Sequence, residues 1–168
     1  PDFKWGALTT LSNSIGQGEI LVTPIQLANM MSAVANKGYY YTPHIIKEIA
    51  GDSIDYRFRN KNIINISEQN FENIEIGLSR VFKSGTGKLL NIPGIEICGK
   101  SGTAENFTKI KGKKTQLTDH SIFVAYAPKK NPKIAIAVLV ENGHYGATWA
   151  GRISSLMIEK YLNKKITS

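Results

Sequence analysis

Two apolar segments joined by a short connection constrain the fold of this chain most. Residues 134–140 are continuously apolar, inside a predicted strand at 133–141, and such a run is typical of a strand covered on both faces. A second apolar segment spans 121–127, and the connection between the two, 128–132, is compact and holds two prolines. This arrangement predicts an antiparallel hairpin. We expect 133–141 to be the central strand of an antiparallel sheet.

Two helices are predicted before this hairpin. Thr23 is in the N-cap position, Pro24 is at the first helical position, and Gln26 completes a capping box. The helix that follows, through 27–35, is apolar on most faces and is expected to be buried. Ser67 caps the second helix. Its apolar residues recur at helical spacing: Phe71, Ile74, Leu78, Val81 and Phe82.

The remaining segments complete the pattern. Residues 39–49 include Pro43 and predict a short or edge strand, whereas 52–66 are polar and irregular. Residues 95–104 predict the first strand of the sheet. The last helix carries one apolar stripe: Trp149, Ile153, Leu156, Met157 and Leu162. The expected fold class is therefore α+β, an antiparallel sheet packed by helices, with the last helix covering the sheet.

The tetrapeptide Lys-Ser-Gly-Thr occurs twice, in two different settings. The copy at 83–86 follows an amphipathic helix, where Gly85 is typical of a C-terminal cap and Lys83 suits the negative end of the helix dipole. We interpret this copy as structural. The copy at 100–103 lies in a predicted strand, where it brings together a cation, a hydroxyl group and a glycine.

The strand copy has the groups to hold an extended ligand. Side chains alternate along a strand, so Lys100 and Ser101 face opposite sides, and both reach one ligand only if it lies along the strand edge. Gly102 would let the ligand approach closely, and the Thr103 backbone N–H could donate to a developing oxyanion. A plain strand end followed by a turn is equally compatible with these four residues.

Further segments, in the same order along the chain, resemble the class B penicillin-binding proteins, in which Lys-Ser/Thr-Gly lies on a strand. The similar segments are Ser14-Ile15-Gly16-Gln17-Gly18, 22–28, 123–128 and 146–150. The resemblance covers nearly all of the 168 residues and is greatest to the transpeptidases of cell elongation. A serine β-lactamase or β-lactam sensor domain shares the fold, but the segments at 14–18 and 22–28 favour the penicillin-binding proteins.

The resemblance implies a fold, an activity and residue roles. The fold is the C-terminal portion of the penicillin-binding transpeptidase and serine β-lactamase-like fold. The parent protein is implied to be a peptidoglycan D,D-transpeptidase, in which a stem peptide or a β-lactam acylates a serine. Lys100 supplies charge, Ser101, Gly102 and Thr103 bind the substrate, and the Thr103 N–H is one arm of the oxyanion hole. No cofactor and no metal are implied, and the implied partner is a membrane-embedded glycan polymerase.

Two motifs of that family are missing from the sequence. No serine has lysine three residues later, as the nucleophilic Ser-x-x-Lys requires, and none has asparagine two residues later. We therefore expect 1–168 to be the C-terminal part of one incomplete transpeptidase domain, with the nucleophile upstream of Pro1. The parent is expected to be anchored in the bacterial inner membrane, with this domain in the periplasm. The isolated fragment is expected to be soluble but inactive, and to self-associate through exposed apolar surface.

The net charge of +8 supports one more alternative, a non-catalytic module that binds the cell wall or another anionic polymer. Four lysines crowd a polar segment that we expect to be a solvated loop: Lys109, Lys111, Lys113 and Lys114. No aromatic residues interleave with them, which argues against nucleic-acid binding. Cys98 is expected to be a buried structural thiol, and His120 and His144 are expected at strand ends or on the surface rather than as catalytic bases.

Overall fold

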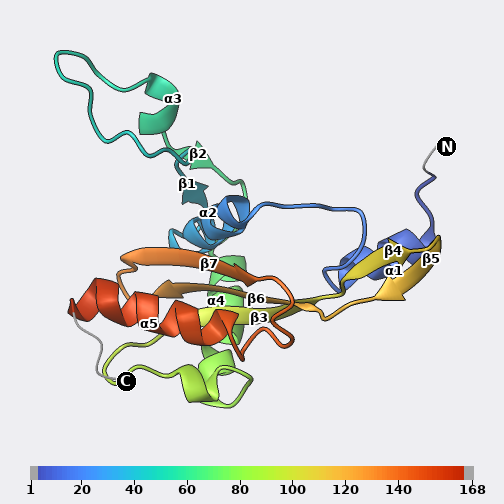
Figure 1. Cartoon of the computed structure of the whole chain (residues 1–168). Coiled ribbons are helices and arrows are strands. Elements are labelled where there is room, and N and C mark those ends of the chain that lie inside the picture. The colour runs from blue at the N-terminus through green and yellow to red at the C-terminus, as the bar shows by residue number, and fades with distance from the viewer. Residues whose placement is uncertain (1–3, 165–168) are drawn as a thin grey trace.

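A three-stranded antiparallel sheet forms the centre of the protein in the computed structural model, which describes residues 4–164 (Figure 1). Its strands are β3 (Cys98–Ala104), β6 (His120–Ala127) and β7 (Ile134–Val140), in the spatial order β3-β6-β7. The predicted hairpin is confirmed, because β6 and β7 pair antiparallel along their length. The predicted central strand is wrong, since β6 is central and β7 is at an edge. β7 is apolar throughout because helices pack on both of its faces.

Two helices cover opposite faces of this sheet. They are α5 (Ala150–Asn163) and α2 (Pro24–Ala35), and both contact β6 and β7. Consecutive side chains of β6 point into opposite layers. Phe123 belongs to the buried cluster on the α5 side, and Val124 belongs to the cluster on the α2 side. The sheet therefore has a hydrophobic core on each face, as the predicted α+β architecture requires.

A third helix, α4 (Glu68–Lys83), passes the β3 edge of the sheet and reaches both layers. Ser67 is its N-cap, as predicted. Leu78 packs in the cluster on the α2 side. Phe82 packs in the cluster on the α5 side, where its ring meets that of Phe123 edge-on at 5.9 Å. The end of α4 therefore delivers the loop that follows it to the outer edge of β3.

Shorter elements surround this core. They are α1 (Ala7–Ser14), β1 (Tyr39–Tyr40), α3 (Tyr56–Arg59), β2 (Asn62–Ile63), the 3-10 helix η1 (Lys88–Leu90), β4 (Phe107–Ile110) and β5 (Lys113–Gln116). β1 and β2 pair with each other, so the segment expected as a short strand contributes only two residues to a ladder. None of the helices that the structure describes is long and apolar enough to cross a membrane.

The lysine-rich segment is a hairpin rather than the expected solvated loop. β4 and β5 pair antiparallel, and the pairing places Lys109 directly opposite Lys114. Like charges in such a position are unfavourable. The Lys114 ammonium lies 3.9 Å from the centre of the Phe107 ring, and this cation–π contact offsets part of the repulsion.

Helix α2 is less buried than its sequence predicts. Its capping contact forms, with Gln26 Oε1 accepting from the Thr23 N–H at 2.8 Å. Met31 and Ala33 are its buried residues, whereas Met30 is 49% exposed. The sheet covers one face of the helix, and another face lines an open apolar pocket of about 410 Å³ that is shared with α4.

Helix α5 is also rotated relative to the predicted apolar stripe. Its buried residues begin with the small Ala150, Gly151 and Ser154 and end with Ile158 and Glu159, and Ile158 packs in the cluster on the α5 side. A Cβ at Gly151 would lie 2.5 Å from Leu90 Cδ1, so the missing side chain lets the helix pack closely. Leu162 is the stripe residue that packs against the core. The exposed members of the stripe are Trp149, Ile153, Leu156 and Met157.

Candidate functional site

The strand copy of the tetrapeptide lies on the outer edge of the sheet, because β3 pairs with β6 alone among the strands described. Lys100 is opposite Val124, which packs on the α2 side. Ser101 is opposite Phe123, which packs on the α5 side. Side chains directly opposite each other in an antiparallel pair share a face. Lys100 and Ser101 therefore leave the strand on opposite faces, as strand alternation predicts.

The outer edge presents backbone groups of Ser101 and Thr103. The Thr103 carbonyl accepts a hydrogen bond from Gln17 Nε2 at 3.0 Å, and the Ser101 carbonyl accepts one from Lys100 Nζ. Both carbonyls therefore point away from β6. The N–H and carbonyl of one residue point to the same side of an antiparallel strand. The Thr103 N–H thus lies on this edge, and the Lys100 ammonium reaches around the strand to the same place.

The second copy of the tetrapeptide meets the first. Thr86 Oγ1 and Ser101 Oγ lie 2.9 Å apart, within hydrogen-bond distance. Helix α4 ends at Lys83, but Ser84 rather than Gly85 is its C-cap, so the predicted glycine cap is wrong. The interpretation of this copy as structural also missed its contact with the strand copy. No local sequence pattern links two residues that are 15 positions apart.

The loop before α5 closes one end of this edge. The Gly146 N–H donates to Thr103 Oγ1 at 3.4 Å, and a Cβ at Gly146 would lie 2.3 Å from the Gly102 carbonyl oxygen. The two backbones approach this closely only because residue 146 has no side chain. The buried Ser121 hydroxyl fixes the loop by donating to the Tyr145 carbonyl at 2.9 Å. No sequence pattern predicted this contact between Gly146 and Gly102.

The edge carries one positive charge, that of Lys100. Lys100 is exposed and forms no ion pair with any residue that the structure describes. Its ammonium group contacts a carbonyl, which does not neutralise its charge. The hydroxyl groups of Ser101 and Thr103 and the Thr103 N–H are close by. One cation with several hydrogen-bond donors is an arrangement that suits a carboxylate.

The other candidate nucleophile, Cys98, is the first residue of β3, and the candidate base His120 lies opposite Ala104 at the other end of that strand. Cys98 is fully buried, as predicted, and burial raises the pKa of its thiol, which suppresses the reactive thiolate. His120 Nδ1 accepts from the Asn142 N–H at 3.1 Å, and His144 lies in a loop at positive φ. Among residues 4–164, no group of three or more His, Cys, Asp or Glu side chains is placed to hold a metal ion.

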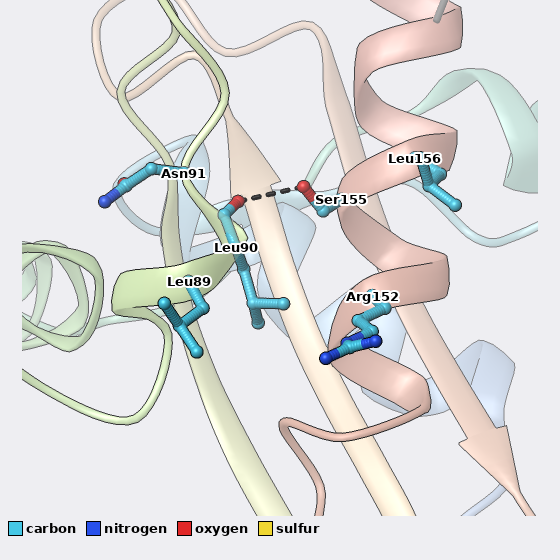
Figure 2. A pocket seen from close by; sticks show the side chains of 6 residues that line it. All are labelled: Leu89, Leu90, Asn91, Arg152, Ser155 and Leu156. Carbon is cyan, nitrogen blue, oxygen red and sulfur yellow. Dashed lines mark hydrogen bonds between the residues drawn. The ribbon is translucent and has the colours of Figure 1, made fainter. Parts of the chain in front are cut away.

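Two hollows in the protein surface are separate from the β3 edge. One, of about 310 Å³, lies between η1 and α5 (Figure 2), beside the 2.8 Å hydrogen bond from Ser155 Oγ to the Leu90 carbonyl. Its lining residues are Leu89, Leu90, Asn91, Arg152, Ser155 and Leu156. The other is the apolar pocket beside α2. Neither contains a residue of 100–103, so the candidate site is an open strand edge rather than a closed cavity.

The sequence matches the penicillin binding protein transpeptidase domain over residues 1–159. It is 35% identical to the peptidoglycan D,D-transpeptidase MrdA of Acinetobacter baumannii over 158 residues, which cover 88% of this chain and 23% of that protein. MrdA of Haemophilus influenzae is 31% identical, over 96% of this chain and 27% of that protein. The chain thus spans about a quarter of the length of these relatives.

Solved structures agree with the sequence match. Pseudomonas aeruginosa PBP2 in complex with WCK 5153 superposes with a TM-score of 0.77 at 32% identity, covering 98% of this chain and 35% of that chain. Penicillin-binding protein A from M. tuberculosis, an imipenem acyl-enzyme complex, superposes with a TM-score of 0.73 at 30% identity, covering 90% and 33%. The expected penicillin-binding transpeptidase fold is therefore confirmed, and the chain belongs to the penicillin-binding protein transpeptidase domain family.

Proposed function

We propose that this chain forms one wall of the active site of a peptidoglycan D,D-transpeptidase. The proposal rests on the groups found along the outer edge of β3. There Lys100 supplies a cation, and Ser101 and Thr103 supply two hydroxyl groups and the outward-pointing backbone groups. The relatives support it, since MrdA is named a peptidoglycan D,D-transpeptidase. An acyl-enzyme complex with imipenem is among the similar structures.

The stem peptide lies along the β3 edge as an added strand. Lys100 and the Ser101 and Thr103 hydroxyl groups bind its terminal carboxylate. The Thr103 N–H donates to the oxygen of the carbonyl under attack, which becomes an oxyanion in the transition state. A Cβ at Gly102 would meet its nearest neighbour, Ile122, at an ordinary 3.5 Å. The fold therefore has room for a side chain there, and its absence serves the approach of the ligand.

The chemistry itself needs a nucleophile that the 168 residues do not supply, since they contain no Ser-x-x-Lys. In the proposed reaction, a serine from another part of the protein attacks the carbonyl of the penultimate D-alanine. The amide C–N bond breaks, and the terminal D-alanine leaves with a proton on its nitrogen. An amine of a neighbouring stem peptide then takes the acyl group and releases the serine. A β-lactam would acylate the same serine by opening of its ring amide.

The substrate determines where the domain works. We place it outside the cytoplasmic membrane, as the C-terminal part of a membrane-anchored protein, because peptidoglycan strands are cross-linked there. A membrane-embedded glycan polymerase is the partner that would supply uncross-linked strands. Both statements rest on the proposed substrate.

The proposal is tested by titrating the ¹⁵N-labelled chain with N,N′-diacetyl-L-Lys-D-Ala-D-Ala and following backbone amide shifts. The expected result is saturable movement of the Ser101, Gly102 and Thr103 amides. The peptide that ends in L-Ala-L-Ala and the variant Lys100→Met serve as controls, and each should weaken the response. Shifts confined to the pocket beside α2, or no shifts at all, would overturn the proposal.

A further inference from the structure

We infer that Thr86 is a positioning residue for the proposed carboxylate site, because its hydroxyl group orients the hydroxyl group of Ser101 toward the ligand. The inference rests on the proposed function and adds a residue from outside the strand motif. It starts from the 2.9 Å distance between Thr86 Oγ1 and Ser101 Oγ.

The direction of this hydrogen bond depends on the ligand. A hydroxyl group has one hydrogen to donate and two lone pairs that accept. Ser101 therefore cannot donate to Thr86 and to a carboxylate at the same time. When a carboxylate accepts from Ser101, the contact persists only if Thr86 donates to Ser101 Oγ. The resulting chain runs from Thr86 through Ser101 to the carboxylate, and each hydrogen bond in it polarises the next.

The backbone around Thr86 is held in place without any ligand. The Gly87 N–H donates to the Val81 carbonyl at 3.0 Å. A Cβ at Gly85 would lie 2.9 Å from Val81 Cα, so the chain turns tightly against the end of α4. The turn that follows is anchored by Leu90, which is 4% exposed. These contacts fix the backbone that carries Thr86 before a ligand arrives, so its hydroxyl group starts within hydrogen-bond distance of Ser101.

The Thr86 side chain does not contribute to the hydrophobic core. It is exposed and belongs to neither buried cluster. Thr86→Val replaces the hydroxyl group by a methyl group of similar size and leaves the core intact. Thr86→Ser keeps the hydroxyl group and removes only the methyl group. Comparing these two variants therefore distinguishes the effect of losing the hydrogen bond from the effect of changing the side-chain shape.

The experiment measures the Kd of N,N′-diacetyl-L-Lys-D-Ala-D-Ala from the β3 amide shifts of the full chain. We expect Thr86→Val to weaken binding about three- to tenfold, the usual effect of one hydrogen bond, and Thr86→Ser to bind like the wild type. The carbonyl of the C-terminal carboxamide peptide accepts a weaker, uncharged hydrogen bond from Ser101, so Thr86→Val should weaken binding of that peptide less. In a Ser101→Ala background, Thr86→Val should cause no further loss.

Each other outcome decides against a specific claim. Wild-type affinity in Thr86→Val overturns the role of Thr86 and leaves the proposed function standing. An equal loss with the carboxamide peptide, or in the Ser101→Ala background, also overturns it, because Thr86 would then act by another route. If the wild-type chain binds neither peptide at β3, the proposed function fails and the role of Thr86 fails with it.

Discussion

The Tyr126 hydroxyl group donates a hydrogen bond to Glu75 Oε2 at 3.2 Å and ties the central strand β6 to α4. Tyr126 is fully buried, and so is Cys98 beside it. Burial is the main cause that raises the pKa of each, and the Glu75 charge adds to it. Burial, with the nearby Glu75 carboxylate, therefore keeps both groups protonated in the folded protein.

This arrangement predicts loss of stability at alkaline pH. In the unfolded chain the two groups lose their protons near their ordinary pKa values of 9.0 for Cys98 and 10.0 for Tyr126. The folded protein holds these protons to higher pH, so the unfolded state binds fewer protons there and the free energy of unfolding falls. The stability contributed by these two protonated groups is fully present below pH 9 and is lost as pH rises above it.

Thermal melts between pH 7.5 and 10.5 should show a falling Tm, and the Tm of the double variant Cys98→Ala/Tyr126→Phe should fall less steeply. A parallel decline in both proteins would contradict the assignment.

Gly146→Ala is expected to destabilise the protein strongly. Its Cβ would lie 2.3 Å from the Gly102 carbonyl oxygen and 2.5 Å from the Ile122 carbonyl oxygen, so backbone would have to shift. We expect a loss of about 2 kcal/mol or more in the free energy of unfolding.

The matched control is Gly77→Ala in α4, where a Cβ would meet nothing within 4 Å. That change should stabilise the helix by about 0.5–1 kcal/mol. Chemical denaturation of both variants checks the contrast, and equal stabilities would refute it.

Gln17→Ala is expected to strengthen binding of the stem-peptide analogue. Gln17 Nε2 donates to the Thr103 carbonyl, which the proposed added strand needs as an acceptor. Removing the amide frees that carbonyl, and Kd should fall about two- to fivefold, the scale of one exposed hydrogen bond. Gln17→Glu also removes the donor but places a negative charge near the bound carboxylate, and it should bind more weakly than Gln17→Ala. Weaker binding by Gln17→Ala would mean that Gln17 contacts the ligand instead of competing with it.

The 168-residue chain is expected not to form a covalent adduct with penicillin. It has no Ser-x-x-Lys, so a β-lactam bound at the β3 edge meets no activated serine. Incubation with a fluorescent penicillin followed by denaturing electrophoresis should give no band, while a penicillin-binding protein with an intact Ser-x-x-Lys labels in parallel. A hydroxylamine-sensitive band from this chain would reveal a nucleophile of another kind.

The features that the sequence predicted well are local. The capping contact between Thr23 and Gln26, the N-cap at Ser67 and the hairpin between β6 and β7 depend on residues a few positions apart. Short-range sterics and hydrogen bonds decide such features in any fold. The same holds for the opposite faces of Lys100 and Ser101, which follow from the strand period of two.

The features that the sequence did not predict depend on distant contacts. β7 is as apolar as a central strand because helices cover both faces, and apolarity alone does not distinguish the two positions. The buried side of α5 depends on its neighbours: Gly151 lies where a Cβ would meet Leu90 of η1, and Ile158 packs in the core in place of most of the predicted apolar stripe. The contact between Thr86 and Ser101 forms because α4 packs along the edge of the sheet at β3, and no local sequence pattern predicts that packing.

The open edge of β3 also bears on which extended chains can pair with it. An open strand edge is a template for any extended chain, including a second copy of the same strand. Here an ammonium group from Lys100 and an amide from Gln17 occupy the Ser101 and Thr103 carbonyls. An incoming strand must displace both. A peptide that ends in a carboxylate is compensated by pairing with the displaced ammonium group, whereas another β3 brings its own lysine and is repelled. Under the proposed function, charge at this edge would favour a peptide that ends in a carboxylate over a second copy of β3.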